Sequence, residues 1–105
     1  MIKHANNLQE FNELTQGQTV VVDFFATWCG PCRMLSPVIE DVDKENLLGI
    51  DFVKVDVDEV PEAAAKFGVS SIPTLIIFKE GKAVDQLLGY RPKAQLVEDI
   101  KKSIE

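Results

Sequence analysis

The sequence predicts an α/β fold in which a central mixed β-sheet is flanked by helices on both faces. Strand-sized apolar runs alternate with segments of helical periodicity, which is typical of parallel strands joined by right-handed crossover helices. Residues 19–26 are apolar almost throughout, as expected of a strand that is covered on both faces. Two strand-like runs near the C-terminus are separated only by a short turn, so they predict a hairpin and make the sheet mixed.

The first helix is expected at residues 7–16. Leu8, Phe11 and Leu14 recur three residues apart, which places them on one helical face. Asn7 is a favourable N-cap, and with a glutamate three residues later it resembles a capping box.

The first strand and the second helix follow. Residues 19–26 are rich in β-branched and aromatic side chains, which favour a strand. The second helix is expected at residues 31–46, where Leu35 and Ile39 share the apolar face. Pro37 lies inside this helix and should bend its axis, because proline removes a helical hydrogen bond.

The C-terminal half predicts a strand at residues 51–57 and a short helix at residues 61–67. The hairpin is expected to pair residues 74–78 with residues 82–88, across a turn that contains a glycine. The last helix should begin at Pro92, because proline is favoured at the first positions of a helix.

The composition limits the possible functions. A length of 105 residues predicts one domain, residues 1–105. A formal net charge of −6 argues against nucleic acid as a partner, because binding to phosphates needs a basic patch. The sequence shows no apolar h-region at its start, and no apolar run approaches the roughly 18 residues of a membrane span. We therefore expect a cytoplasmic protein that does not enter a membrane.

The chain has two cysteines, Cys29 and Cys32. A disulfide between them closes a ring of only four residues, and such a bridge adds less stability than one that closes a long loop. The pair is therefore expected to serve chemistry. A zinc site needs four ligands, and the single histidine, His4, is distant in sequence. We expect no metal and a surface position for His4.

The cysteines belong to the motif Trp28-Cys29-Gly30-Pro31-Cys32, between the apolar strand and the second helix. The start of a helix offers unpaired N–H groups and the positive end of the helix dipole, which stabilise an anion. A thiolate placed there has a pKa below the usual value of about 8.5. Because Cys29 precedes the helix, we expect it to be the more exposed sulfur and the nucleophile. Cys32 lies in the first turn and should resolve the mixed disulfide.

Four segments, at residues 22–32, 52–56, 72–74 and 78–81, resemble the thioredoxin family in their residues and their order. The resemblance implies a thioredoxin fold and a general protein-disulfide reductase. Such a protein donates electrons to disulfide-containing target proteins and is re-reduced by thioredoxin reductase. It needs no bound cofactor, because NADPH supplies electrons only through the reductase. We further expect a monomer.

Asp23 interrupts the apolar strand at residues 19–26, so its carboxyl should be buried and its pKa raised. Two interpretations are open: an aspartate satisfied by neighbouring hydrogen bonds, or a proton acceptor for Cys32 as it attacks the mixed disulfide. The resemblance implies the second role, directly or through a water. It also implies that Lys54 lies near Asp23 and tunes its charge, the alternative being an exposed lysine on a strand.

On sequence alone, nothing distinguishes the peptide bond before Pro73 in the segment Ile72-Pro73-Thr74 from other bonds before proline, which are mostly trans. The resemblance implies a cis peptide bond before Pro73, facing the cysteine pair, with backbone beside it free to pair with an extended substrate. Two interpretations of Trp28 are open: a residue that contacts the substrate, or a residue that packs in the core. The expected substrate-binding residues are Trp28, Gly30, Pro31, Ile72, Pro73, Thr74 and Gly89.

The sequence departs from common family residues at four positions. Phe25 stands where many members have tryptophan, and Arg33 replaces a frequent lysine, so packing and charge are kept. Ser71 stands where glycine is frequent, and Tyr90 follows Gly89 where a smaller residue is common. Both lie near the expected substrate-binding residues, so they concern the choice of partner and not the chemistry.

Two other functions fit the same residues. One is an oxidant or isomerase on the same fold, since the direction of electron flow depends on the reduction potential. The other is a binding module that uses the same apolar surface without catalysis. The Gly30-Pro31 pair between the cysteines and the expected location both favour the reductase.

Overall fold

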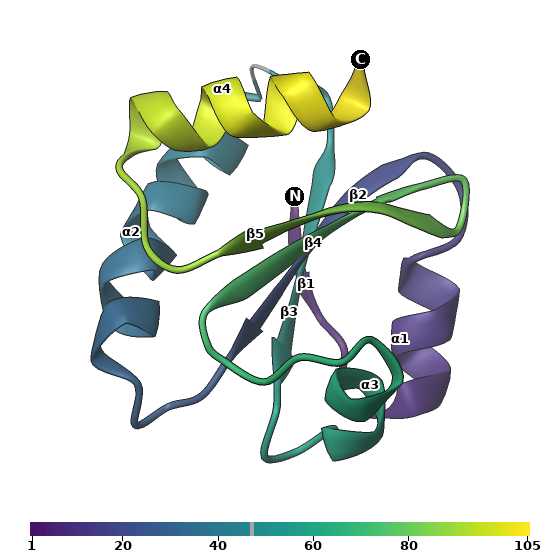
Figure 1. Cartoon of the computed structure of the whole chain (residues 1–105). Coiled ribbons are helices and arrows are strands. Elements are labelled where there is room, and N and C mark those ends of the chain that lie inside the picture. The colour runs from purple at the N-terminus through teal and green to yellow at the C-terminus, as the bar shows by residue number, and fades with distance from the viewer. Residues whose placement is uncertain (47) are drawn as a thin grey trace.

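The computed structural model describes residues 1–46 and 48–105. It contains a five-stranded sheet in the order β1-β3-β2-β4-β5, with four helices packed around it (Figure 1). The strands are β1 (Ile2–His4), β2 (Thr19–Phe25), β3 (Asp51–Asp56), β4 (Thr74–Lys79) and β5 (Lys82–Leu88). The helices are α1 (Leu8–Leu14), α2 (Gly30–Glu45), α3 (Pro61–Lys66) and α4 (Lys93–Ile104).

The sheet is mixed, as predicted. β3 pairs in parallel with both β1 and β2, whereas β4 is antiparallel to both β2 and β5. β1 was not predicted from the sequence. It is only three residues long, and its side chains alternate too briefly to signal a strand. Its formation depends on pairing with β3, fifty residues further along the chain.

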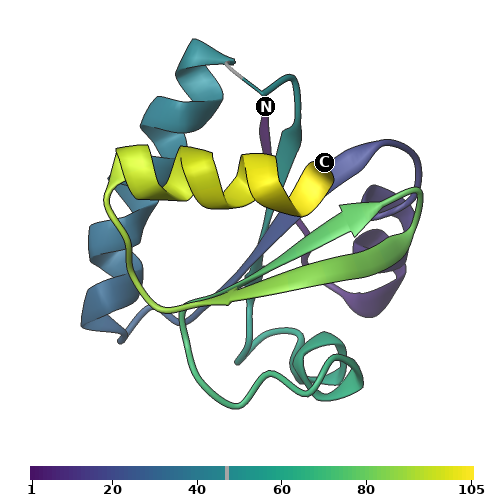
Figure 2. The same cartoon turned by 45° about the horizontal axis from the view of Figure 1, so that its top comes forward.

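Helices cover both faces of the sheet, as predicted. α2 and α4 lie on one face and α1 and α3 on the other (Figures 1 and 2). On the α1 and α3 side, Phe11 packs against Phe24, Phe67 and Phe78 with ring centroids between 5.7 and 6.0 Å apart. The opposite core is mostly aliphatic, with Phe52 of β3 buried in it, and is built mainly from residues of β2, β3, β4, α2 and α4.

The helices begin within one residue of their predicted starts, whereas α1 ends at Leu14, two residues before its predicted end. Asn7 is the N-cap of α1, and its side chain accepts a hydrogen bond of 2.8 Å from the Glu10 N–H. The Glu10 carboxylate accepts from the Asn6 N–H, one residue earlier than in a capping box. Pro37 lies inside α2, and Cys29 is the N-cap of that helix.

The hairpin between β4 and β5 turns at Glu80 and Gly81, whose φ angles are +52° and +82°. Positive φ at both central residues is what a two-residue hairpin turn of the primed type requires. Among the described residues, no helix has both the length and the apolar character needed to cross a membrane.

Candidate active site

Cys29 and Cys32 form a disulfide at the junction between β2 and α2. Cys29 is the N-cap of α2, and its sulfur accepts a hydrogen bond of 3.2 Å from the Cys32 N–H. This N–H is one of the donors that the first helical turn leaves without a partner in the helix. The same donor would stabilise a thiolate on Cys29 once the disulfide is reduced.

The two sulfurs are not distinguished by exposure. Cys29 is 5% exposed and Cys32 is 4% exposed, so the expectation that Cys29 is clearly the more exposed is not met in the oxidised form. In the disulfide, both cysteines pack in the same apolar cluster as Ala26, and the partly buried Ile72 packs against it. Their positions do differ, because Cys29 precedes α2 whereas Cys32 lies within its first turn.

Asp23 is buried beneath this junction, as expected, with 1% of its surface exposed. Val21 packs in the core that contains α2 and α4, and alternate strand residues point to the same face, so the Asp23 side chain faces α2. Burial raises the pKa of Asp23 to about 6, and the positive charge of Lys54 opposes the rise. Its Oδ1 has no hydrogen-bond partner among the described residues, which argues against a carboxylate satisfied by its neighbours.

Lys54 lies opposite Asp23 on the neighbouring strand β3. Its Nζ is 4.0 Å from Asp23 Oδ2, and 14% of the lysine side chain is exposed, so the alternative of an exposed strand lysine is wrong. The ammonium donates to Ser36 Oγ at 3.0 Å and stands 4.6 Å from the centroid of the Phe25 ring.

A pocket of about 270 Å³ opens next to this group. It brings Cys32 to the same solvent-accessible space as Lys54. The pocket is lined by Phe25, Ala26, Thr27, Cys32, Arg33, Ser36 and Lys54. A water in this pocket would find the Lys54 ammonium and the Ser36 hydroxyl as polar partners.

The Ile72–Pro73 peptide bond is cis, as the resemblance implied. The Ile72 carbonyl oxygen is 3.9 Å from the Cys29 sulfur, so this loop faces the disulfide. The Pro73 carbonyl accepts a hydrogen bond of 2.9 Å from the Gly89 N–H, which places the loop before α4 beside it. Pro73 is buried, and so is Thr74, whose hydroxyl donates to the Ser71 carbonyl at 2.6 Å. Thr74 therefore holds the loop from within and offers no side-chain surface to a substrate.

Trp28 is 66% exposed, so the core-packing alternative is wrong. Its indole Nε1–H donates to Asp58 Oδ2 at 2.9 Å, which fixes the ring against the loop after β3. Gly30 and Pro31 are exposed beside it, and a Cβ at Gly30 would meet no atom within 4 Å. The space above the disulfide is therefore open to a partner.

We use the name docking surface for Trp28, Gly30, Pro31, Ile72 and Gly89. Other large apolar side chains are also exposed in the described chain. They include Met34 in α2 and the pair Leu88 and Tyr90, which flanks Gly89. Exposed apolar side chains beside a reactive centre are candidates for contact with a partner.

Two residues near the site were not predicted. Asp58 could have been found from topology, because β2 and β3 are parallel and their carboxyl ends reach the same edge of the sheet. Ser36 lies four residues after Cys32 on α2, a spacing that puts both on one helical face. Nothing in the sequence indicates that its hydroxyl meets Lys54.

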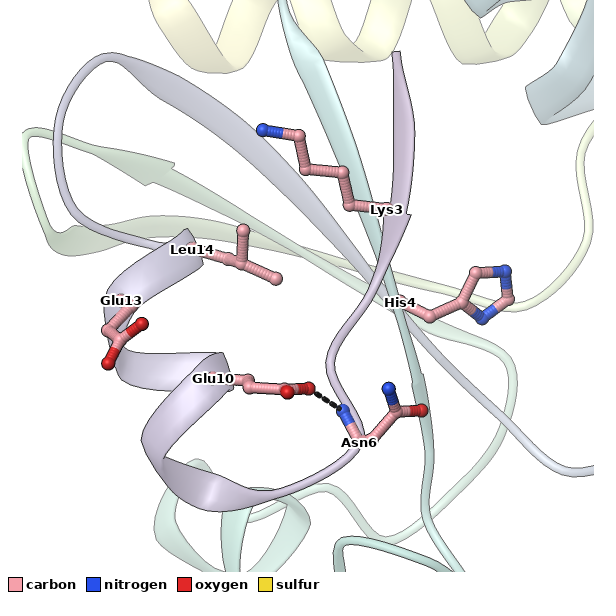
Figure 3. Close-up of a pocket in the computed structure, with 6 residues that line it drawn as sticks. All are labelled: Lys3, His4, Asn6, Glu10, Glu13 and Leu14. Atoms are coloured by element: carbon pink, nitrogen blue, oxygen red, sulfur yellow. Dashed lines mark hydrogen bonds between the residues drawn. The ribbon is translucent and has the colours of Figure 1, made fainter.

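A second pocket, of about 450 Å³, lies between β1 and α1 (Figure 3). It is lined by Lys3, His4, Asn6, Glu10, Glu13 and Leu14. His4 is exposed, as predicted, and in Figure 3 its ring is directed away from Glu10. No cluster of three or more metal-ligating side chains occurs in the described part of the chain.

Comparison with known proteins gives one family throughout. The family model described as Thioredoxin matches residues 2–102. A thioredoxin of Listeria monocytogenes is 47% identical over 104 residues, which is 99% of this chain and 100% of the relative. A thioredoxin of Staphylococcus haemolyticus is 49% identical over 94 residues, 90% of each chain. The solved structure of a Plasmodium falciparum thioredoxin superposes with a TM-score of 0.87 at 40% identity and covers 95% of this chain and 97% of that one.

Proposed function

Because the chain belongs to the thioredoxin family, and is therefore a thiol–disulfide oxidoreductase that reduces protein disulfides, we propose that Cys29 is its nucleophile and Cys32 its resolving cysteine. The observation that carries this assignment is the Cys32 N–H bond to the Cys29 sulfur at the N-cap of α2. It stabilises negative charge on Cys29 in preference to Cys32.

The reaction has two exchange steps. The Cys29 thiolate attacks one sulfur of a target disulfide, which forms a mixed disulfide and releases the other target sulfur as a thiolate. Cys32 then gives its proton to Asp23 and attacks the Cys29 sulfur. The second target sulfur leaves, so the target gains two electrons and the Cys29–Cys32 disulfide forms.

Asp23 is proposed as the proton acceptor because of its burial and its position. A base is most effective when its pKa is near the working pH, and burial raises the pKa of Asp23 to about 6. Lys54 limits that rise and is the proposed tuning residue. The proton passes directly or through a water in the pocket shared by Cys32 and Lys54.

The docking surface is proposed to hold the target. An extended target segment would pair with the backbone beside Pro73, while Trp28 and Ile72 cover the target disulfide. The exposed indole and the open space above Gly30 support this arrangement.

The physiological setting follows from the direction of the reaction. We propose disulfide-containing proteins as targets and a thioredoxin reductase as electron donor, with NADPH acting through that reductase and no cofactor bound here. A reductant of this kind works where thiols are kept reduced, so we propose a cytoplasmic location. Residues 1–105 are proposed to act as one domain and as a monomer.

The test is insulin reduction by dithiothreitol, followed as turbidity. The protein should accelerate it, and Cys29→Ser should abolish the acceleration. Cys32→Ser should accumulate target proteins as mixed disulfides that dithiothreitol releases. Acceleration that survives Cys29→Ser, or traps formed equally well by Cys29→Ser, would contradict the assigned roles. Equilibration with a glutathione buffer then separates a reductant from an oxidant on the same fold.

A further inference from the structure

We propose that Ser36 is a positioning residue, which holds the Lys54 ammonium beside the Asp23 carboxyl and keeps it from forming a direct hydrogen bond there. The inference rests on the proposed function, since it concerns the proton acceptor of the second exchange step. It assigns a role to a residue that touches neither sulfur through any hydrogen bond in the structure.

The contacts of the ammonium carry the argument. Lys54 Nζ donates to Ser36 Oγ at 3.0 Å and lies over the Phe25 ring. Its distance to Asp23 Oδ2 is 4.0 Å, which is longer than a hydrogen bond between nitrogen and oxygen. The ammonium is therefore bound by a hydroxyl and an aromatic face, and acts on Asp23 only through its charge.

An ammonium carries three N–H donors, so Ser36 holds Lys54 back by fixing where its Nζ lies and not by occupying its only donor. Asp23 Oδ1 is buried without a partner among the described residues, and a bond between two charged groups is shorter and stronger than one to a hydroxyl. The two residues face each other on paired strands. When the Ser36 hydroxyl is removed, the ammonium should therefore move toward Asp23.

A direct bond would weaken the proposed base. It would stabilise the carboxylate and lower the pKa of Asp23, so that the group would accept a proton from Cys32 less readily. By holding Lys54 back, Ser36 keeps the carboxyl protonatable near neutral pH.

Among the charged groups near Asp23, Lys54 is the one whose position should change most when Ser36 is replaced. α2 brings Cys32 and Arg33 to the shared pocket, and the Arg33 side chain is exposed. Along β3, Asp56 follows Lys54 by two residues and so lies on the same face. On its other side Asp23 is paired with apolar Leu75 of β4.

The experiment is a carboxyl-carbon NMR titration of Asp23 in the oxidised protein. The thiols do not titrate in the disulfide, so the transition belongs to Asp23, and Asp23→Asn identifies its signal. Ser36→Ala should lower the pKa of Asp23 by about 1 unit. Ser36→Thr keeps the hydroxyl and should restore the wild-type value. A pKa that is unchanged or raised in Ser36→Ala would overturn the proposal.

A double variant shows whether Ser36 acts through Lys54. In a Lys54→Gln background, Ser36→Ala should leave the pKa of Asp23 unchanged, since the coupling between the two sites is lost. The same downward shift in that background would contradict the positioning role.

A kinetic arm separates this inference from the proposed function. The release of a preformed mixed disulfide should slow in Ser36→Ala at pH 7, by at most about tenfold, as expected for a base weakened by about one unit. If the NMR shift appears without any slowing, Ser36 positions Lys54 but Asp23 is not the proton acceptor. If neither appears, the positioning role itself fails.

Discussion

The carboxyl group of Asp23 occupies a place where ionisation is unfavourable. It is 1% exposed, and burial raises its pKa from 3.8 to about 6. The folded chain therefore binds this proton more tightly than the unfolded chain. The stability that the protonated Asp23 carboxyl contributes is therefore fully present below pH 3.8 and is lost as the pH rises through about 6.

Asp23→Asn should therefore stabilise the protein where the carboxyl is ionised. A pKa difference of this size corresponds to a gain of up to about 3 kcal/mol at pH 8, which should fade to nearly zero below pH 4. The measurement is urea unfolding of both proteins across this pH range. Asp41→Asn is the matched control, because Asp41 is an exposed aspartate of α2. A pH-independent difference would show that the pKa of Asp23 is the same in the folded and the unfolded chain, so that burial does not raise it.

Trp28 permits a test of docking that spares the fold. With 66% of its surface exposed, Trp28→Ala should leave the unfolding free energy within about 0.5 kcal/mol of wild type. It should raise KM for a protein disulfide by about tenfold, because exposed tryptophans are frequent binding hot spots. Val84→Ala removes an exposed apolar side chain of β5 that is not part of the docking surface and is the comparison. Equal loss of activity toward a small aromatic disulfide would point to the chemistry instead of docking.

The sequence was informative about residues whose type was unusual for their place. The cysteine pair, the aspartate within an apolar strand and the tryptophan beside a reactive sulfur were all recognisable. Ser36 and Asp58 were not, because serine on a helix and aspartate in a loop are ordinary. Only packing brings their oxygens to Lys54 and Trp28.

The N-caps of α1 and α2 have the same geometry but different effects. Asn7 caps α1 with its side-chain oxygen, and Cys29 caps α2 with its sulfur. Both satisfy an N–H of the first turn. In α1 the effect is on stability, and in α2 it is available to the thiolate.

Asn7→Ala should cost about 1 kcal/mol of unfolding free energy, because the Glu10 N–H loses its acceptor. The loss should be visible in urea unfolding, since α1 carries Phe11 into the aromatic core. Asn12→Ala, at an exposed position within the same helix, should be neutral or slightly stabilising. A comparable loss in both variants would mean that the cap is not the cause.

Long elements were predictable and short ones depended on partners. α2 and β2 have strong internal patterns and ended within one residue of their predicted bounds. β1 was missed because three residues carry no periodicity. Thr74 was correctly predicted to begin a strand. It was also expected at the substrate, and its complete burial, which removes its side chain from a substrate, follows only from the packing of the folded chain.

The whole molecule does not rely on its disulfide for stability. The bridge joins residues three positions apart, whereas two separate cores pack against the two faces of the sheet. Reduction should therefore lower the unfolding free energy by only about 2 kcal/mol, the loop-entropy value for so short a ring. Urea unfolding with and without dithiothreitol measures this. A reduced protein without a cooperative transition would show instead that the bridge is structural.

The central position of β2 has a consequence for which parts of the molecule open first. β2 is hydrogen-bonded on both sides, to β3 and β4, whereas β1 and β5 form the edges of the sheet. In deuterium-exchange experiments, amides of β2 and β4 should exchange last and those of the edge strands earlier. Cys29 follows β2, and the Ile72–Pro73 step directly precedes β4. Thermal fraying of β1 would therefore leave the sulfurs and the loop that faces them in place, so a molecule opened at that edge would still be a competent reductant.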